Sequence, residues 1–478
     1  MATSVFDSRV FRNLYGTQEM REVFSDEAYV TRMIEVETAL SRAQSKVGMI
    51  DILAGDALTK AAASVKIDYE QLSLDTEIVG YPVLPLVKQL VAQIDDPDVA
   101  KFVHWGATTQ DIMDCASQLQ MRRGLELVRA KLEELTATLR ALSVKHRDTL
   151  MAGRTHLQHA LPVTFGYKCA VYLSGLVRHL ERLGEIERRC LLVQFGGAAG
   201  TLASLGGEAD PESTAGVRVR AALAAELGLA DPPITWHAVR DTVAEILSFL
   251  ALVGGSLGKI AYDIIVMASN ELGEVSEPFV PHRGASSTMP QKRNPISAEV
   301  IYAASKLLRS QAALGFDAMV VDFERASGPW HLEWAAIPAA FVAAAGALHQ
   351  TQFALAGLVV HTNAMRANLG STRGLIVSEA CMMRLAPFLG RQAAHDVVYE
   401  ACRQSIDSDR DLFDILTTLP SVTDHLDEAA LRSVCDPANY LGASQIMVDN
   451  MVHIADATVP LKNGLQKGAE NGTKVNGL

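Results

Sequence analysis

The feature that most constrains this chain is a set of long stretches whose apolar residues recur at helical spacing. The longest starts at Ile112 and keeps leucine, isoleucine and valine on one face for about thirty residues, up to Val144. At about 1.5 Å of rise per residue, such a stretch forms a rod of roughly 50 Å. Four more long stretches follow, at 163–193, 236–270, 297–316 and 334–368. With little strand signal beside them, they predict an all-α protein built on an extended helical bundle.

The amino-acid composition favours close helix packing. Hydrophobic residues make up 49% of the chain but aromatic residues only 6%, so alanine, leucine and valine must form most of the core. Alanine is the best helix former and lets helix axes approach one another. Helices that are apolar around so much of their circumference commonly bury a second face against a partner subunit. We therefore expect a homo-oligomer.

Changes of pattern along the chain predict three helical domains. The first, residues 1–110, has short helices, and the second, 111–365, holds the long rods and a polar loop at 278–295. The third, 366–478, alternates short helices with glycine and proline. Its polar, glycine-rich end from Asn463 onward is expected to be a disordered tail.

Charge, cysteine spacing and the N-terminus disfavour several classes of function. The net charge is −12 and no basic face is clustered, so no nucleic-acid partner is expected. The N-terminus lacks the apolar run of a signal peptide. The longest apolar stretches, 246–257 and 335–348, are shorter than the ~18 residues of a membrane span, so we expect no membrane association and a cytoplasmic location. The six cysteines form no CxxC pair, which favours reduced thiols over disulfides or a zinc site.

The most informative loop segment is 278–295, after which a helix begins at Pro295. Paired serines indicate a polar loop, and Lys292 and Asn294 concentrate hydrogen-bond donors at its end. A helix N-terminus beside such donors favours an anion, because its free N–H groups and its dipole carry positive charge. Composition alone leaves an ordinary surface loop equally open.

A second segment, Gly153–His159, places two imidazoles, an amide, a hydroxyl and a guanidinium between two apolar helices. Polar groups at such a place must be hydrogen-bonded or functional. A histidine here can serve as a general acid, because its ordinary pKa lies near neutrality. A zinc site would need a third ligand at metal spacing, which the sequence does not offer, so no metal and no cofactor are expected.

A third segment, 103–111, leads into the longest helical stretch. Thr108, Thr109 and Asp111 can cap that helix, which is the simplest explanation of their presence. The same helix N-terminus can also hold a carboxylate, so the two roles are compatible.

These three segments resemble the active-site regions of the fumarase/aspartase superfamily. The signature loop is matched by the paired serines, Met289-Pro290, Lys292, Asn294-Pro295 and Glu299, and the other two regions by 153–156 and 106–111. The resemblance covers nearly the whole chain and is closest to the branch of adenylosuccinate lyase and 3-carboxy-cis,cis-muconate cycloisomerase. It implies three helical domains, with the central long-helix bundle forming the core of a homotetramer. It also implies composite active sites, to which three subunits each contribute one segment.

The resemblance further implies a mechanism on a small di- or tricarboxylate. Ser286 would be the base that removes a proton beside one carboxylate, giving an enediolate. Lys292, Asn294 and N-terminal amides would stabilise that negative charge. His156, oriented by Glu299, would protonate or steer the leaving group. Besides Asn294, the residues assigned to substrate binding are Thr108, Thr109, Thr155, Gln158, Ser287, Met289, Arg12, Tyr15, His237 and Arg240.

Three positions depart from adenylosuccinate lyase and disfavour a role in purine biosynthesis. Leu14-Tyr15, Tyr81-Pro82-Val83 and Trp334 stand where that enzyme has an Arg-Tyr pair, a second catalytic histidine and a phosphate-binding arginine. Without those cations a phosphate would lose charge-assisted hydrogen bonds. The chain is more similar to the cycloisomerases, except that bacterial members resemble Gly-Arg-Thr-Trp where this chain has His156. A histidine there suits a leaving group that must be protonated.

We therefore expect a C–N lyase that eliminates an amine from an N-substituted aspartate by anti β-elimination and releases fumarate. The alternative reaction is that of 3-carboxy-cis,cis-muconate cycloisomerase. The alternative of another class is an inactive, crystallin-like structural protein. Some residues also have a simpler structural explanation: hydrogen-bonded structural histidines for His104 and His237, and surface pairing with Asp241 or Glu324 for Arg240 and Arg325.

Overall fold

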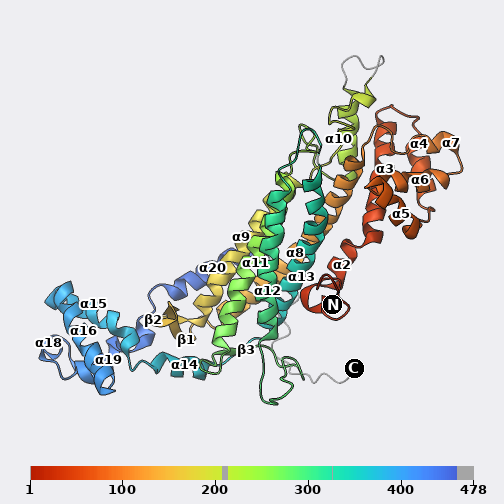
Figure 1. The fold of residues 1–478 in the computed structure, drawn as a ribbon. Helices are drawn as coiled ribbons and strands as arrows, with labels where there is room; N and C mark the ends of the chain where they lie inside the picture. Colours follow the sequence, from red (N-terminus) through yellow and green to blue (C-terminus); the bar gives the residue numbers. More distant parts are fainter. Residues whose placement is uncertain (1, 207–213, 326, 460–478) are drawn as a thin grey trace. The chain divides into compact units, whose positions relative to one another are not determined.

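The computed structural model of the chain describes residues 2–206, 214–325 and 327–459 (Figure 1). Residues 207–213 and the tail predicted from Asn463 lie outside these residues. Within them the chain is a succession of helices with four short strands in two small sheets, so the all-α prediction is confirmed.

The longest helices lie in the middle of the chain, and most of those before and after them are shorter. The first elements are α1 (Arg12–Tyr15), α2 (Gln18–Val23), α3 (Asp26–Lys46), α4 (Ala54–Ala62), α5 (Tyr69–Val79), α6 (Val83–Ala92) and α7 (Pro97–Ala100). The middle elements are α8 (Thr109–Lys145), β1 (Leu150–Thr155), β2 (Gln158–Thr164), α9 (Phe165–Cys190), η1 (Ala203–Leu205), α10 (Ala215–Leu227), α11 (Asp241–Met267), β3 (Val275–Ser276), α12 (Ile296–Asp317), η2 (Gly328–Trp330), α13 (His331–Ala356) and β4 (Val359–Val360). The last elements are α14 (Thr362–Gly370), η3 (Leu375–Val377), α15 (Ser378–Leu389), α16 (Arg391–Ser408), α17 (Leu412–Leu416), α18 (Pro420–Thr423), α19 (Glu428–Val434), η4 (Pro437–Asn439) and α20 (Ser444–Thr458).

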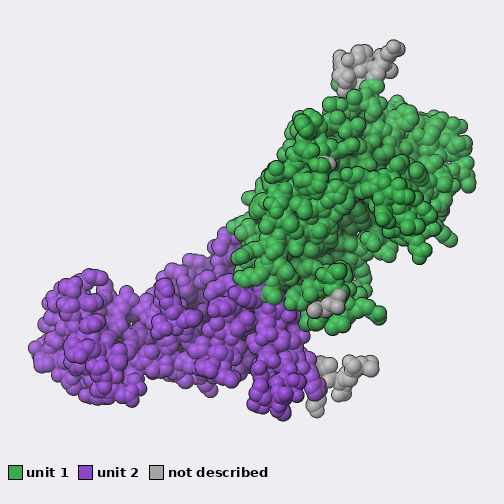
Figure 2. Space-filling model, viewed as in Figure 1, with its two compact units in different colours: residues 1–131, 179–257, 303–349 green, residues 132–178, 258–302, 350–478 purple. Residues whose placement is uncertain are grey.

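The chain divides into two compact units, shown in Figure 2. Unit 1 comprises residues 1–131, 179–257 and 303–349, and unit 2 comprises 132–178, 258–302 and 350–478. Each of the long helices α8, α9, α11, α12 and α13 contributes residues to both units. The three-domain division made from the sequence stays a prediction.

The core of unit 1 is built from small residues on long helices. Four alanines of α13 are completely buried: Ala340, Ala343, Ala344 and Ala347. On α8, Gly124 lies under the Phe341 ring, where an added Cβ would come within 2.5 Å of a ring carbon. On α13, Gly346 lies against the Tyr15 carbonyl so closely that no side chain would fit. These small residues let α8 and α1 pack directly on α13.

Two of the long helices are apolar over a greater length than the sequence analysis estimated. Asp241–Met267 and Gly328–Ala356 are long and apolar enough to cross a membrane by length and composition, so the argument that the stretches are too short was wrong. The core helices of globular proteins pass the same test. Within the chain, 50% and 67% of their most apolar windows are buried, as in core helices. The absence of a membrane span stays a prediction.

Unit 2 combines the hairpin β1–β2 with the C-terminal helices. Its helices α15 to α19 enclose an apolar cluster of their own that includes Leu385, Val398 and Leu412. Two ion pairs hold the later helix α20: Arg140 at the end of α8 pairs with Asp456 at 2.9 Å, and Arg147, just after α8, pairs with Asp449 at 2.8 Å. All six cysteines are free thiols, as predicted.

Candidate active site

The signature loop of unit 2 is closed at its base by its own backbone. The Asn294 N–H donates to the Gly284 carbonyl at 2.9 Å, and Ala285 and Arg293 form an antiparallel bridge. Gly284 has a φ of +69°, and a Cβ at this position would collide with the Asn294 carbonyl oxygen. The predicted polar loop therefore has a defined frame, which only glycine allows at position 284.

Within this frame, Ser286 is surrounded by backbone donors. Its Oγ accepts the Thr288 N–H at 3.2 Å and the Met289 N–H at 3.1 Å. Two N–H groups aimed at one hydroxyl oxygen stabilise negative charge on it, because hydrogen bonds to an ionised acceptor are the strong ones. The loop thus supplies the donors that a serine needs in order to act as a base.

Lys292 and Asn294 lie at the far end of the same loop. The Lys292 side chain is exposed, and no carboxylate of the described residues lies within ion-pair distance of its ammonium. Asn294 is half-buried, and its neighbour Arg293 stacks on the Phe279 ring at 4.5 Å. Between the two cations, Lys292 is therefore the one available to an anionic substrate.

The N-terminus of α12 differs from the prediction. The Glu277 carboxylate accepts the N–H groups of Ser297 at 3.2 Å and Ala298 at 2.8 Å. The anion at this helix terminus is thus a side chain of the protein itself. The expectation that these N-terminal amides stabilise the enediolate was wrong, because a carboxylate already occupies them.

Arg283 anchors the loop to its surroundings and was missed in the sequence. It donates to the Ser297 Oγ at 2.6 Å and to the Gln350 Oε1 at 2.8 Å, and its guanidinium covers the Phe353 ring at 4.2 Å. No local sequence signal marks this role, because two of the partners lie more than sixty residues away on α13.

The second predicted segment is a β-hairpin rather than a loop between helices. Thr155 pairs with Gln158, so His156 and Leu157 form a two-residue turn between β1 and β2. Their φ angles are +52° and +61°, the left-handed pattern of the tightest hairpin turns. Neither residue is glycine, so the turn stores backbone strain of about 1 kcal/mol or more per residue. The turn places an exposed imidazole at the hairpin tip, next to exposed Thr155 and Gln158.

The base of the hairpin is fixed by a buried ion pair. Arg154 donates to both carboxylate oxygens of Glu274, at 3.0 and 2.7 Å, and Glu274 is completely buried. Asn368 donates to the same carboxylate at 3.0 Å. Burial, and then the charge of Arg154, lowers the pKa of His159, so that imidazole is neutral at pH 7. A neutral imidazole is a poor general acid, which disfavours His159 as the proton donor.

The predicted His156–Glu299 pair is not formed within unit 2. Both side chains are exposed, and no hydrogen bond or ion pair joins them in the described residues. Glu299 lies in the first turn of α12, and Ser287 and Met289 are exposed on the signature loop. The pairing stays a prediction.

In unit 1 the third segment starts α8 as predicted. The Asp111 carboxylate accepts the Thr108 N–H at 3.0 Å, which caps the helix. It also accepts the N–H groups of Gly196 and Gly197, both at 2.9 Å, and lies 2.7 Å from the His237 Nε2. His237 is 2% exposed, which favours the structural role over substrate contact. Thr108 and Thr109 are half-buried, and Arg325 donates to the Thr108 hydroxyl rather than pairing with Glu324.

Arg240 is buried and does not pair with Asp241 on the surface, so that expectation was wrong. Its guanidinium donates to Asp114 at 2.8 and 2.9 Å and to Glu333 at 2.9 Å, and it covers the Trp236 ring at 4.8 Å. These bonds occupy most of its donors, which disfavours a substrate contact. Of the remaining predicted residues, Arg12 is exposed on α1, and Tyr15 at the end of α1 is half-buried.

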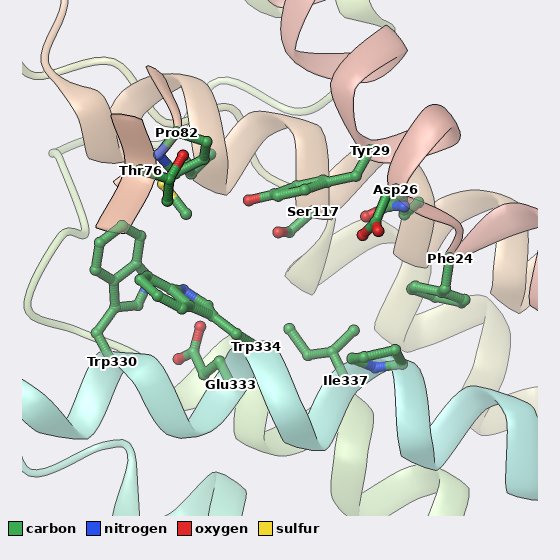
Figure 3. A pocket seen from close by; sticks show the side chains of 13 residues that line it. Phe24, Asp26, Tyr29, Thr76, Pro82, Ser117, Trp330, Glu333, Trp334 and Ile337 are labelled. Carbon is green, nitrogen blue, oxygen red and sulfur yellow. The ribbon is translucent and has the colours of Figure 1, made fainter. Parts of the chain in front are cut away.

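Unit 1 also contains a cavity of about 350 Å³ that the sequence did not reveal (Figure 3). It lies between the start of α3, the first part of α8 and the start of α13, and its walls include Trp330, Trp334, Glu333, Tyr29 and Asp26. In the described residues no group of three or more His, Cys, Asp and Glu side chains is arranged to hold a metal ion.

This helical protein carries a serine with two backbone N–H donors, a lysine without a carboxylate partner in the described residues, and a histidine in a strained turn. These are groups that a lyase can use for proton transfer. The chain belongs to the fumarase/aspartase superfamily of lyases: a family described as Lyase matches residues 15–307, and Adenylosuccinate lyase C-terminus matches residues 374–451.

Several known proteins are similar to this chain over nearly its whole length. Trans-aconitate decarboxylase 1 of Mycosarcoma maydis is 43% identical, over 92% of this chain and 88% of that protein. The 3-carboxy-cis,cis-muconate cycloisomerase of Acinetobacter baylyi (94% and 99% covered) and the nitrosuccinate lyase of Streptomyces davaonensis (96% and 97%) are each 39% identical. The crystal structure of a fumarate lyase from Mesorhizobium sp. BNC1 is 51% identical, with a TM-score of 0.85 over 92% of this chain and 98% of that one. The predicted superfamily is confirmed, and the reactions named for its members differ.

Proposed function

We propose that the protein eliminates an amine from an N-substituted aspartate and releases fumarate. The observation that carries the proposal is the pair of backbone N–H groups on the Ser286 Oγ, at 3.2 and 3.1 Å. A serine is a weak base until its alkoxide is stabilised, and these donors, with the ammonium of Lys292 on the same loop, provide that stabilisation.

The reaction proceeds in two steps. The Ser286 alkoxide removes the proton from the carbon beside one carboxylate, and the electron pair moves into that carboxylate to give an enediolate. Lys292 and Asn294 stabilise the added charge. The electron pair then returns to form the carbon–carbon double bond, while the pair of the C–N bond leaves with nitrogen. His156 donates a proton to that nitrogen, so fumarate and an amine are released.

The site is proposed to be composite, within a homotetramer. His156 and Glu299 are both exposed and unconnected in one unit, which supports their meeting residues of another copy. Large apolar side chains exposed on the long helices support the same assembly: Val171 (51%), Leu252 (53%), Tyr262 (44%) and Tyr302 (38%). Six free cysteines support a reducing compartment such as the cytoplasm.

A second candidate is the cycloisomerase reaction. It is favoured by the 39% identity to the Acinetobacter baylyi enzyme over nearly the whole chain. His156 favours the lyase, because an amine leaves only after protonation, whereas closure of a lactone needs no protonated leaving group. The nitrosuccinate lyase at the same identity has nitrogen on its named substrate, which supports C–N chemistry on this fold.

A substrate panel separates these candidates. The protein is incubated with a series of N-alkyl and N-aryl aspartates, with 3-carboxy-cis,cis-muconate, nitrosuccinate and trans-aconitate, and fumarate, loss of muconate absorbance and carbon dioxide are measured. We expect fumarate and a stoichiometric amine from at least one aspartate. Turnover of the muconate or of trans-aconitate, with no fumarate from any aspartate, would overturn the proposal.

A further inference from the structure

The cavity of unit 1 has aromatic walls of a defined geometry. The Trp330 and Trp334 rings lie 5.2 Å apart at 80°, and Tyr81 stacks on Trp330 at 5.8 Å. Figure 3 shows the Trp334 ring beside Trp330 on one side of the cavity, and Tyr29 and Asp26 of α3 on the other. With about 350 Å³, the space holds a small organic molecule of one ring.

The charge around this cavity is negative. Glu333 belongs to the buried group in which one guanidinium, Arg240, serves two carboxylates, Asp114 and Glu333, so one negative charge is in excess when both are ionised. Asp26 lies at the rim, exposed, and no described residue pairs with its carboxylate. No lysine or arginine of the described residues lines the cavity.

Two pKa directions agree with this picture. Burial raises the pKa of the Tyr29 hydroxyl; a hydrogen bond with Ser117 works against this, and the charges of Asp114 and Glu333 add to the increase. Burial is also the largest cause that raises the pKa of Glu333; the charge and hydrogen bond of Arg240 oppose it without cancelling it, and the charge of Asp114 adds to it. Both groups therefore sit in an environment that would gain from an added positive charge.

We infer that this cavity binds an organic ammonium group, held by the faces of the tryptophans and by the carboxylate of Asp26, while the buried Glu333 adds negative charge behind the wall. Ring faces attract cations, and a desolvated carboxylate nearby strengthens the attraction. An anionic or phosphorylated group would be repelled by the same walls.

The inference rests on the proposed function in one respect, because it identifies the cavity as the site of the departing amine. Met113 and Ser117 line it from α8, about 6 Å and 12 Å along the helix from Thr109, the predicted ligand of a substrate carboxylate. A substrate could then place its carboxylates at the helix N-terminus and its amine in the cavity. The substrate class is accordingly an aspartate whose nitrogen substituent is aromatic or carries a second amine.

The test uses three ligands of one shape and different charge: benzylammonium, benzyl alcohol and benzoate. Binding to the full-length protein is measured by calorimetry and by tryptophan fluorescence, since Trp330 and Trp334 line the cavity. We expect benzylammonium to bind at least about tenfold more tightly than benzoate, with the alcohol between them. Equal or tighter binding of benzoate would overturn the inference.

Two substitutions locate the binding. Trp334→Leu and Asp26→Asn should each weaken benzylammonium binding about fivefold or more, and Asp26→Asn should leave benzyl alcohol unaffected. Asp56→Asn is the matched control, because Asp56 is likewise an exposed acid in the first turn of a helix but lies outside the cavity. If both cavity variants bind benzylammonium within twofold of the unchanged protein, the cavity is not the site.

The binding experiment and the substrate panel can fail independently of each other. Benzylammonium binding that depends on Trp334 and Asp26, without fumarate from any aspartate, would retain the cation site and reject the reaction. Release of fumarate, with benzylammonium binding unchanged in both variants, would retain the reaction and reject the cation site.

Discussion

The signature loop and the buried group around Arg240 use similar residue types in different ways. Arg240, Asp114 and Glu333 are each at most 3% exposed, and each charge has a charged partner. On the loop, Lys292 is exposed without a carboxylate, and the Ser286 Oγ accepts two N–H groups but has no charged partner in the described residues. Completely paired charges hold a fold together, whereas groups left partly unpaired on a rigid frame are available to a substrate.

The largest effect expected from this contrast is loss of turnover in Ser286→Ala. Removing the base should lower kcat about 10⁴-fold, the upper end of what a positioned proton-transfer group contributes. The free energy of unfolding should change by less than about 0.5 kcal/mol, because the serine is not part of a core. Fumarate release and urea denaturation measure the two quantities. A variant that keeps a tenth of the activity would contradict the assignment of the base.

The buried group should show the opposite behaviour. Arg240→Met leaves two carboxylates buried without their cation, so the free energy of unfolding should fall by about 3–5 kcal/mol. Arg403→Met, which removes a surface pair with Glu400, is the control and should change the free energy of unfolding far less. Denaturant unfolding measures both. Equal losses in the two variants would mean that burial does not distinguish these ion pairs.

The frame of the loop can be tested separately from its chemistry. Gly284→Ala places a Cβ against the Asn294 carbonyl, so the loop must shift and turnover should fall about 10²-fold. Gly273→Ala is the matched control: its φ is +55°, but an added Cβ meets nothing within 4 Å. The control should cost about 1 kcal/mol of stability and little turnover. Similar kinetics in the two variants would show that turnover does not depend on the backbone closure of the loop at Gly284 and Asn294.

The smallest expected effect concerns a paired group that titrates, His104, whose Nδ1 lies 2.7 Å from the Glu37 carboxylate. Burial works to lower the pKa of His104, but the hydrogen bond and charge of Glu37 outweigh it and leave that pKa raised above 6.5. Stability from such a group is fully present below its unfolded pKa and is lost as pH rises through the folded one.

His104→Gln should therefore lower the free energy of unfolding by about 1–2 kcal/mol near pH 5.5 and by less near pH 9. Denaturation at both pH values measures this. His453→Gln, which changes an exposed histidine, should show no such difference. An equal loss for His104→Gln at both values would rule out the pair as a pH-dependent contribution.

The long helices could be predicted from the sequence because their signal is local and repeated. The cap at Asp111 was predictable for the same reason, since it acts on Thr108 three residues away. Two expectations failed where a distant partner decides the outcome. Glu277 reaches the helix terminus at Ala298 from 21 residues earlier, and Asp114 pairs with Arg240 across 126 residues.

The hairpin was missed for a different reason. Its turn residues, His156 and Leu157, are not the glycine or asparagine from which a two-residue turn is normally predicted. Tertiary contacts, above all Arg154 on Glu274, hold the backbone in that conformation against local preference. The strained site is also where the candidate proton donor lies, so sequence reasoning failed where the backbone is least typical.

The two-residue turn limits how this enzyme can diversify. Side chains alternate across a strand, so inserting or deleting one residue between Thr155 and Gln158 would reverse the facing of every residue that follows in β2. Exchanging the histidine for another side chain leaves the hairpin register intact. New reactions on this scaffold are therefore accessible through point substitution at the tip, whereas a longer reach toward the substrate would require rebuilding the hairpin.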